Sequence, residues 1–588
     1  MTICGCQSTS TTPILNDNSN EHIELPDDPY AEMQRLTQLA SISTPDTATT
    51  LYSRSLAIAI ELEDAEYLES ILQNLHPDQI DPQMYSNVQL FNIENELNLK
   101  ISKDVRDTLN NVQIYTRDQQ DRFFRLSAHL YELEQQYDDA ANALMQITPD
   151  RQTLQALNEQ IWNNCTLSSS REIKQQLRSN KSRYARAWWT LADTMYESFS
   201  LVEEQNALAI WLRRNTAHPG AQFLPAPLLQ LAQATVASRT IALFLPLSGR
   251  LGTAGKAIRE GFLAAYYHSG YPHSILVIDT FEQDMNALYE QAVADRVDII
   301  VGPLDKGNLE SLMRYPGRRI PVLALNMLRD AHLEEEAARP ESATMLQFSL
   351  AVEDEAKSVA HRVNQEGLLN IALVSSTDGW SVRAAREFKL GLAPNRKVVA
   401  ELLLNDVKST TGKLGDVLSV SDSLKRNTNL QKVIGSSAEM TPRSRKDIDV
   451  IIAMVDGLKA SALISALEYH FTDDIPVFAV SHVTQRLPKS QLTQLNRIEF
   501  TEIPWRIDES IIRKNMADNF GAANRTVDPL NAFGVDAFRL LDKLELMLTS
   551  NRQVLHGGTG KLSINAQNKV ERGLYWVKIQ SGKVAYAW

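Results

Sequence analysis

Glycine is missing from a long stretch of this chain. After Gly5 the next glycine is Gly220, although the 588 residues include 24 glycines. Glycine adopts the positive φ angles of tight turns more readily than any other residue. A stretch without it favours antiparallel helices, whereas α/β folds use glycine where strands lead into helices. The sequence therefore predicts two architectures, an all-α region followed by an α/β region.

Cysteine, basic charge and long apolar runs are also scarce. Three cysteines cannot form a disulfide framework. With a formal net charge of −13, the chain offers no basic stripe for phosphates, so we expect no nucleic-acid partner. No apolar run reaches the roughly 18 residues that indicate a transmembrane helix.

Enzyme motifs are absent as well. The sequence contains no S-x-x-K, H-E-x-x-H, G-x-S-x-G or P-loop pattern, and its 11 histidines are scattered rather than spaced as metal ligands. We therefore expect a non-enzymatic protein with no catalytic residues, no metal site and no cofactor.

The first residues resemble a lipidation signal. In Ile3-Cys4-Gly5-Cys6, an aliphatic residue and two small residues precede a cysteine, as in a lipobox. The charged and apolar parts of a signal peptide are missing before it, so either the true start lies upstream or the likeness is accidental. We expect residues 1–5 to be a signal-peptide remnant and Cys6 to carry lipid; the alternative is an ordinary cysteine pair. Residues 6–28, rich in Ser, Thr, Asn and Asp, are typical of a flexible tether spanning about 25 Å on average.

Residues 29–236 have the apolar spacing of helices. The tripeptide Glu61-Leu62-Glu63 recurs as Glu132-Leu133-Glu134, and the segment from Phe123 to Ala140 resembles the large–small pattern of a tetratricopeptide (TPR) repeat. The prediction is a TPR-like solenoid, with an irregular helical bundle as the alternative. Either would offer a protein-binding surface and not a reaction site.

Prolines and tryptophans give further expectations for this region. Pro45 and Pro82 fall between helical segments, where helices can stop. The adjacent Trp188 and Trp189 are expected to pack in the core.

Residues 237–588 alternate between strands and helices. Apolar runs of strand length show no polar alternation, which predicts parallel sheets covered on both faces and arranged as two lobes that divide near Phe348. The expected strands are Ile241–Leu247, Ser274–Asp279, Val297–Val301, Val322–Asn326, Asn370–Ser375, Val398–Leu404, Val450–Met454 and Val477–Val480. The expected helices between them include Lys256–His268, Glu282–Ala294, Asp354–Gln365, Val382–Leu392 and Leu458–His470.

Several segments of this half carry a family resemblance. The run Ile241–Gly252, the turn Val301-Gly302-Pro303-Leu304 and the crossover Gln347–Leu350 look like parts of a type I periplasmic-binding-protein fold. The tail from Gly557 is similar too, and it is expected to form a two-stranded ribbon that turns at Ser581-Gly582. Taken with the lipobox and the TPR-like half, the chain resembles the penicillin-binding protein activators, outer-membrane lipoproteins of LpoA type.

That resemblance implies both a fold class and a function. The fold would be an all-α TPR-like solenoid followed by a two-lobed α/β type I periplasmic-binding-protein fold. The protein would be lipid-anchored to the periplasmic side of the outer membrane. Its partner would be a class A penicillin-binding protein, a bifunctional peptidoglycan synthase, whose transpeptidase activity it would stimulate without being an enzyme itself.

The candidate small-molecule site is the cleft between the lobes. Ser248, Gly249 and Gly252 precede a helix, where backbone N–H groups can hold an anion, whereas Asp305 would repel one. The same residues also fit a fold-defining turn and helix cap. The alternative function is a periplasmic solute receptor that closes on an amino acid or cell-wall fragment.

Overall fold

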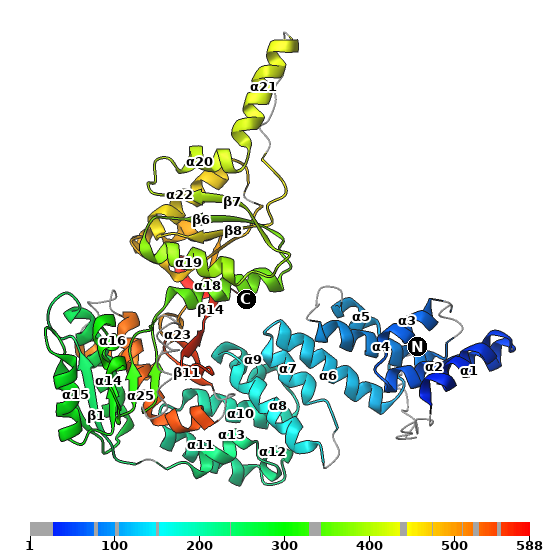
Figure 1. Cartoon of the computed structure of the whole chain (residues 1–588), viewed down its shortest axis with the longest axis horizontal. Coiled ribbons are helices and arrows are strands. Elements are labelled where there is room, and N and C mark those ends of the chain that lie inside the picture. The colour runs from blue at the N-terminus through cyan, green and yellow to red at the C-terminus, as the bar shows by residue number, and fades with distance from the viewer. Residues whose placement is uncertain are drawn as a thin grey trace, which may run out of the picture. The chain divides into compact units, whose positions relative to one another are not determined.

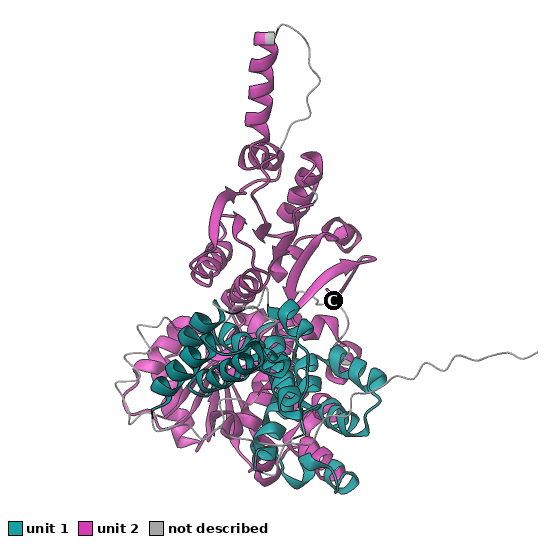
Figure 2. Ribbon diagram, turned by 90° about the vertical axis from the view of Figure 1, so that its right-hand side faces the viewer, with its two compact units in different colours: residues 1–193, 211–226 teal, residues 194–210, 227–588 magenta. Residues whose placement is uncertain are grey.

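The computed structural model describes residues 28–73, 75, 80–99, 105–148, 152–235, 237–328, 343–434, 444–472, 474–508, 510–520, 528–549 and 554–587. The lipobox-like start with Cys6, and the tether as far as residue 27, lie outside these described residues. By internal contacts the chain divides into unit 1, residues 1–193 and 211–226, and unit 2, residues 194–210 and 227–588 (Figure 2). The expected domain limits at 28/29 and 236/237 stay predictions.

The first part of the described chain is helical (Figure 1, blue to blue-green). Its helices are α1 (Pro29–Ser41), α2 (Pro45–Glu61), α3 (Ala65–Leu72), α4 (Pro82–Asn98), α5 (Val105–Asn111), α6 (Arg117–Leu133), α7 (Tyr137–Leu144), α8 (Leu154–Leu167), α9 (Ser170–Ser179), α10 (Arg183–Glu197), α11 (Leu201–Arg214), α12 (Pro219–Gln222) and α13 (Ala226–Gln233). Helices that follow one another, such as α1 and α2 or α6 and α7, pack together. This neighbour-on-neighbour packing is typical of helical repeats.

Turns without glycine end two of these helices. Glu63 after α2 and Gln135 after α6 adopt φ angles of 55° and 58°, the left-handed region that glycine usually fills. In the first turn the Glu-Leu-Glu tripeptide ends at the positive-φ residue Glu63 itself. In the second turn it ends at Glu134, one residue before the positive-φ residue Gln135, so the sequence repeat and the structural repeat differ by one residue.

Capping residues explain where the helices begin. Pro45 and Pro82 occupy the first turn of α2 and α4, so they start helices and do not stop them. Thr116 forms a reciprocal capping box with Gln119 at the start of α6.

Tryptophans form the core of the later helices in unit 1. Trp188 and Trp189 are fully buried, which confirms the expectation of core packing. The Trp188 ring lies 5.7 Å from Trp211 and 6.1 Å from Trp162 between centroids. Gly220 packs directly on Trp188, because a Cβ there would lie 2.3 Å from the indole ring.

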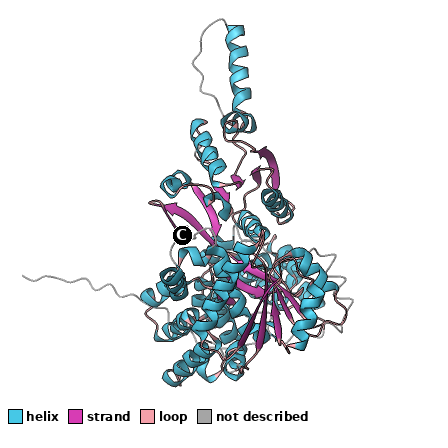
Figure 3. Cartoon of the chain, turned by 90° about the vertical axis from the view of Figure 1, so that its left-hand side faces the viewer, coloured by secondary structure: helices cyan, strands magenta, loops and turns pink. Residues whose placement is uncertain are grey.

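The first lobe of unit 2 contains a parallel five-stranded sheet with the order β2-β1-β3-β4-β5. Its strands are β1 (Thr240–Leu245), β2 (Ser274–Asp279), β3 (Ile299–Val301), β4 (Val322–Ala324) and β5 (Met345–Gln347). Its helices are α14 (Gly252–Ser269), α15 (Met285–Ala294), α16 (Lys306–Arg314), α24 (Ile511–Phe520) and α25 (Asp528–Thr549). Alternate residues of β1 pack into two different cores, one with α14 and α25 and the other with α15 and α16, so helices cover both faces (Figure 3).

The second lobe contains a seven-stranded sheet with the order β15-β14-β10-β9-β8-β6-β7. Its strands are β6 (Asn370–Ser375), β7 (Lys397–Leu403), β8 (Val450–Met454), β9 (Val477–Ala479), β10 (Ile498–Glu502), β14 (Tyr575–Gln580) and β15 (Lys583–Tyr586). Helical elements here are α18 (Val352–Gln365), α19 (Gly379–Leu390), α20 (Thr410–Val417), α21 (Val420–Ile434), α22 (Gly457–Tyr469), η2 (Ser481–Thr484), η3 (Lys489–Leu495) and α23 (Pro504–Ile507). Two cores again lie on opposite faces, one with α22 and the other with α18 and α19.

The C-terminal part of the chain crosses from the second lobe to the first and back again. After the second-lobe strand β10 it returns to the first lobe as α25, which packs on α14. It then forms a small antiparallel sheet of β11 (Leu555–Gly557), β12 (Gly560–Ile564) and β13 (Val570–Gly573). The expected ribbon that turns at Ser581-Gly582 is β14 and β15, which join the large sheet, while Gly557 belongs to the small sheet.

The predicted fold class is confirmed. A helical region precedes a two-lobed α/β region whose strands fall where the apolar runs predicted them. The strands β5, β10, β11, β12 and β13 and the helices α16, α20, α21, α23, α24 and α25 were not predicted individually.

Candidate functional site

Ser248 lies in the loop between β1 and α14, at the carboxyl end of the first-lobe sheet. Its hydroxyl donates to Asp279 Oδ2 at 2.8 Å, and the neighbouring Leu247 N–H donates to Asp279 Oδ1 at 2.8 Å. These hydrogen bonds, with a third from Phe281 N–H, lower the pKa of the Asp279 carboxyl, the Leu247 bond contributing most. Of the residues predicted to line the cleft, Ser248 therefore already binds a carboxylate of the chain itself through its hydroxyl.

The two glycines of this loop have structural roles. Gly249 has a φ of +66°, and a Cβ there would lie 2.0 Å from the Phe281 ring. Gly252 begins α14, and its N–H donates to the Gly249 carbonyl oxygen at 3.1 Å. A larger residue at Gly249 would strain both the backbone and the packing of Phe281.

Asp305 follows the neighbouring strand β3 and is the N-cap of α16. Its Oδ1 accepts from Gly307 N–H at 2.9 Å and from Asn308 N–H at 3.2 Å. Because β1 and β3 are parallel neighbours, Asp305 and Ser248 follow strands that end at the same edge of the sheet. The four residues thus share one edge, and a ligand role for them stays a prediction.

The second lobe carries a charged cluster at the corresponding strand ends. Lys459 Nζ lies 3.1 Å from Asp378 Oδ2, after β6, and 3.0 Å from Asp456 Oδ2, after β8. Asp378 precedes α19 and Asp456 caps α22, and hydrogen bonds from Ser376 and Lys459 lower the pKa of Asp378. The lysine is largely buried, with 11% of its side chain exposed, and two carboxylates already share its charge.

Sequence reasoning missed this cluster although a signal was present. Asp378 and Asp456 are each followed by glycine shortly after a predicted strand. An aspartate shortly after a strand is a common N-cap of the helix that follows. The partner Lys459 could not have been assigned to Asp378, because 81 residues separate them.

A group of buried polar contacts lies beside this cluster. Glu355 of α18 accepts from Ser481 N–H at 2.6 Å, from the Ser481 hydroxyl at 2.9 Å and from the Thr501 hydroxyl at 2.9 Å. The neighbouring His482 ring stacks on Trp380 with centroids 4.0 Å apart, and burial lowers its pKa. These contacts join α18 to the ends of β9 and β10. Both carboxylate oxygens of Glu355 accept hydrogen bonds in them.

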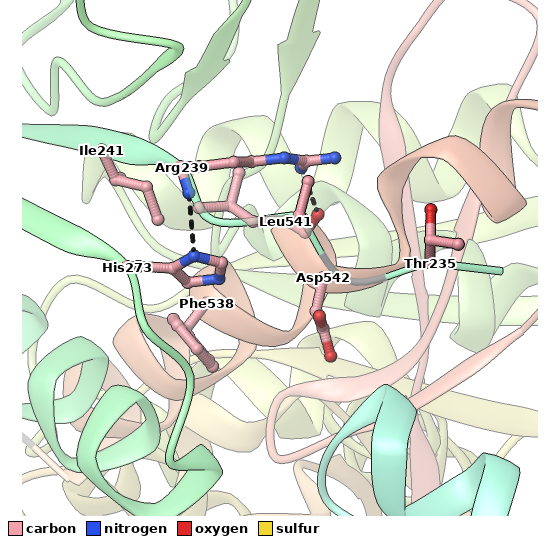
Figure 4. Close-up of a pocket in the computed structure, with 8 residues that line it drawn as sticks. Thr235, Arg239, Ile241, His273, Phe538, Leu541 and Asp542 are labelled. Atoms are coloured by element: carbon pink, nitrogen blue, oxygen red, sulfur yellow. Dashed lines mark hydrogen bonds between the residues drawn. The ribbon is translucent and has the colours of Figure 1, made fainter.

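A small pocket lies at the opposite end of β1 from Ser248 (Figure 4). It holds about 20 Å³, enough for about one water molecule. Arg239 N–H donates to His273 Nδ1 at 3.2 Å, and the Arg239 guanidinium donates to the Leu541 carbonyl at 3.2 Å. The lining residues are Thr235, Ala237, Arg239, Ile241, His273, Phe538, Leu541 and Asp542. An amino acid or cell-wall fragment would not fit.

Within the described ranges, no group of His, Cys, Asp and Glu side chains has the arrangement of a metal site. In the same part of the chain, no helix combines the length and apolar character needed to cross a bilayer. Cys165 is buried in unit 1, and burial raises the pKa of its thiol well above the usual value. The predicted lipid acceptor, Cys6, lies outside the described residues.

Comparisons with known proteins identify relatives over most of the chain. The family model described as LppC putative lipoprotein matches residues 26–582. The Penicillin-binding protein activator LpoA of Vibrio cholerae serotype O1 is 26% identical over 436 residues, 72% of this chain and 71% of the relative. The LpoA of Aliivibrio fischeri is 23% identical over 540 residues, 89% of this chain and 87% of the relative.

Solved structures show lower similarity. Full-length LpoA from Haemophilus influenzae aligns with 95% of this chain and 99% of its own length, with a TM-score of 0.48 and 19% identity. The LpoA C-domain from the same organism, described as a regulator of PBP1A, aligns with 59% of this chain at a TM-score of 0.46 and 22% identity. The match of the family model over nearly the whole chain confirms the sequence resemblance to penicillin-binding protein activators of LpoA type, and the chain belongs to the LppC family of putative lipoproteins.

Proposed function

We propose that this protein is a non-enzymatic regulator of peptidoglycan synthesis that binds a class A penicillin-binding protein and stimulates its transpeptidase activity. The observation that carries the proposal is the family match over residues 26–582, together with relatives named as penicillin-binding protein activators. The absence of S-x-x-K from the whole sequence fits a regulator that lacks a transpeptidase site of its own.

The proposed location follows from the lipoprotein family. Cys6 would carry the lipid that anchors the chain to the periplasmic side of the outer membrane, and residues 6–28 would form the tether. A diacylated anchor holds a protein at a membrane for long periods, unlike a single short chain.

Stimulation requires preferential binding. An activator accelerates the synthase only if it binds the active conformation more tightly than the inactive one. A tenfold shift of that equilibrium corresponds to about 1.4 kcal/mol of differential binding free energy. A few side-chain contacts can supply a differential binding free energy of this magnitude.

The solute-receptor alternative has weaker support. In the first lobe, the Leu247 N–H and the Ser248 hydroxyl donate to Asp279, and in the second lobe, Asp378 and Asp456 neutralise Lys459. A ligand with a carboxylate and an ammonium group would have to compete with these internal pairs.

A reconstituted cross-linking assay tests the proposal. The purified chain is titrated into the bifunctional synthase of the same organism with lipid-linked peptidoglycan precursor, and cross-linked muropeptides are quantified. We expect cross-linking to rise with the concentration of the chain and to be zero without the synthase. An unchanged cross-linking rate at saturating concentrations, combined with a melting temperature raised by amino acids or muropeptides, would overturn the proposal in favour of the receptor.

A further inference from the structure

A group of exposed cations lies on α9 and at the start of α10, in unit 1 (Figure 1). Residues 171–186 contain six Lys and Arg residues and a single acidic residue, Glu172. All six cations are exposed, and we call them the basic patch: Arg171, Lys174, Arg178, Lys181, Arg183 and Arg186. Charges of one sign gathered on a surface raise the local concentration of ions of the opposite sign, so the patch favours an anionic partner.

The net charge of the chain conceals this patch. Residues 1–100 contain 16 acidic and three basic residues, so the whole net charge of −13 belongs to them. The remaining 488 residues carry equal numbers of acidic and basic side chains. Helices α1 to α4 lie within the acidic segment, and α5 to α8 separate them from α9 along the chain. The overall charge therefore says little about the surface of α9 and α10.

One face of α9 carries half of the basic patch. At about 100° per residue, Arg171, Lys174 and Arg178 lie within about 60° of one another around the helix and span about 10 Å along it. Gln176, on the opposite side, is buried, and its Nε2 donates to Asp138 of α7 at 2.8 Å. Packing on α7 thus determines that the cationic face of α9 is the one left in water.

The neighbouring carboxylates have partners of their own. Glu172 forms a capping box with Ser169, in which its Oε2 accepts from Ser169 N–H at 2.6 Å. Asp138 accepts the hydrogen bond from Gln176. Within the described ranges, four cations of the patch form no side-chain ion pair, namely Arg178, Lys181, Arg183 and Arg186. Their charges are therefore available to an anion from outside the chain.

A polymer that carries carboxylates fits the patch better than a membrane or a small anion does. Among the described residues from 116 to 201, no large apolar side chain is exposed, so the patch has nothing to insert into a bilayer. A single exposed ion pair contributes little, so a small anion would be held weakly, whereas a polymer makes several such contacts at once. Four of the six cations are arginines, whose planar guanidinium pairs with carboxylates through two hydrogen bonds.

We propose that the basic patch binds the peptide chains of peptidoglycan through their free carboxylates. This inference rests on the proposed function, which places the chain in the periplasm beside the peptidoglycan layer. The contact holds unit 1 on the polymer whose synthesis the protein regulates. The same carboxylates repel the acid-rich helices α1 to α4, so only one part of unit 1 is attracted to the polymer.

Two variants of the full chain test the patch. The patch variant replaces the four cations without an ion-pair partner and carries Arg178→Gln, Lys181→Gln, Arg183→Gln and Arg186→Gln. The matched control replaces four exposed cations of unit 2 and carries Arg250→Gln, Arg319→Gln, Arg386→Gln and Lys432→Gln. Each variant loses the charges of three arginines and one lysine. Circular dichroism and melting temperature report whether each variant is folded.

The measurement is the dissociation constant for purified, insoluble peptidoglycan, obtained by co-sedimentation at low and high salt. We expect the patch variant to bind about tenfold more weakly at low salt, with a smaller difference at high salt, because ions screen exposed charges. The control should stay within about twofold of the parent chain, because its lost charges are dispersed. Peptidoglycan whose carboxyl groups have been converted to methylamides should bind the parent chain as weakly as untreated peptidoglycan binds the patch variant.

A parallel assay separates this inference from the proposed function. Stimulation of the synthase is measured on lipid-linked precursor without preformed peptidoglycan. If the parent chain does not stimulate the synthase, the proposed function fails, whereas co-sedimentation still decides the role of the patch. If the parent chain stimulates the synthase but does not co-sediment with peptidoglycan, the inference is wrong while the proposed function stands.

Three further results would overturn the inference. The first is equal loss of peptidoglycan binding in the patch variant and the control, and the second is undiminished binding of the parent chain to the methylamide form. The third is a patch variant that binds peptidoglycan like the parent chain but loses binding to phosphatidylglycerol vesicles or stimulation of the synthase. That result would assign the patch to a membrane surface or to the synthase.

Discussion

His218 lies among aromatic rings in the core of unit 1. Its Nδ1 accepts from Gly220 N–H at 3.0 Å, so the neutral ring carries its proton on Nε2, which donates to the Tyr184 carbonyl oxygen at 3.1 Å. The rings of Trp188 and Trp211 each lie 5.3 Å from the imidazole. Burial lowers the pKa of His218 below its usual value, because a charge among these rings would be poorly solvated.

The lowered pKa makes the stability of unit 1 depend on pH. The unfolded chain binds a proton at His218 near pH 6.5 and the folded chain binds it only at lower pH, so stability is lost as pH falls below about 6.5. We expect the stability of His218→Asn, which keeps an acceptor for Gly220 N–H, to fall less between pH 7.5 and pH 5.5 than the stability of the parent chain. Urea unfolding followed by tryptophan fluorescence at the two pH values measures this difference.

The control for this prediction is His129→Asn on α6. His129 is partly buried and lies outside the tryptophan cluster. It reports the effect of the same histidine-to-asparagine change at a site away from the tryptophans. Equal pH dependence in the parent chain and in His218→Asn would contradict the assignment.

At the scale of elements, α14 and α25 cross with their backbones in contact. A Cβ at Gly261 would lie 2.0 Å from the Asn531 carbonyl oxygen, and a Cβ at Gly534 would lie 2.0 Å from the Ile258 carbonyl oxygen. Each helix thus provides a glycine where the other passes. This crossing lies in the largest core of the first lobe, beside Phe262 and Phe538.

Replacing Gly534 should separate these helices. We expect Gly534→Ala to lower the stability of unit 2 by about 2–3 kcal/mol, because a backbone carbonyl cannot move aside as a flexible side chain can. Gly412→Ala on α20 is the matched control, since a Cβ there meets nothing within 4 Å. It should raise stability by about 0.5 kcal/mol through helix propensity. Thermal unfolding compares the two, and similar effects from both would show that the crossing is not close-packed.

At the scale of the whole molecule, residues 194–210 belong by their contacts to unit 2, although they form parts of α10 and α11. Helix α25 holds this segment. Arg539 donates to the Ser198 and Phe199 carbonyl oxygens at 3.3 Å each, and Asp542 Oδ2 accepts from Leu201 N–H at 2.9 Å. Lys543 forms an ion pair with Glu204, both largely buried.

The buried ion pair gives a prediction for this segment. Lys543→Ala leaves the Glu204 carboxylate, only 8% exposed, without its cation, which should cost about 3 kcal/mol. Hydrogen–deuterium exchange should then speed up in residues 201–208 while the helices before residue 183 keep their protection. Lys514→Ala, at an exposed position on α24, serves as control and should change neither. Unchanged exchange in the Lys543 variant would show that α25 does not hold the segment.

The sequence alone predicted the order of the two architectures and most strands of the α/β part. These features are local: the absence of glycine limits the turns of a helical array, and a run such as Ile241–Leu245 is apolar because its sheet is covered on both faces. The strands β5 and β10 escaped prediction because polar or charged residues interrupt their apolar runs, Gln347 in β5 and Glu499, Thr501 and Glu502 in β10. The family resemblance could also be recognised from the sequence alone, because it depends on short segments of the chain.

The tertiary structure alone decided which groups the candidate site residues contact. Asp279 accepts a hydrogen bond from the hydroxyl of Ser248, which lies 31 residues away in the sequence. Lys459 pairs with Asp378, which lies 81 residues away. Helix α25 returns to the first lobe and brings Lys543 to Glu204 across 339 residues. Such pairings depend on which chain segments fold against one another, and hydrogen bonds and ion pairs act only at contact distance, so no local pattern in the sequence reports them.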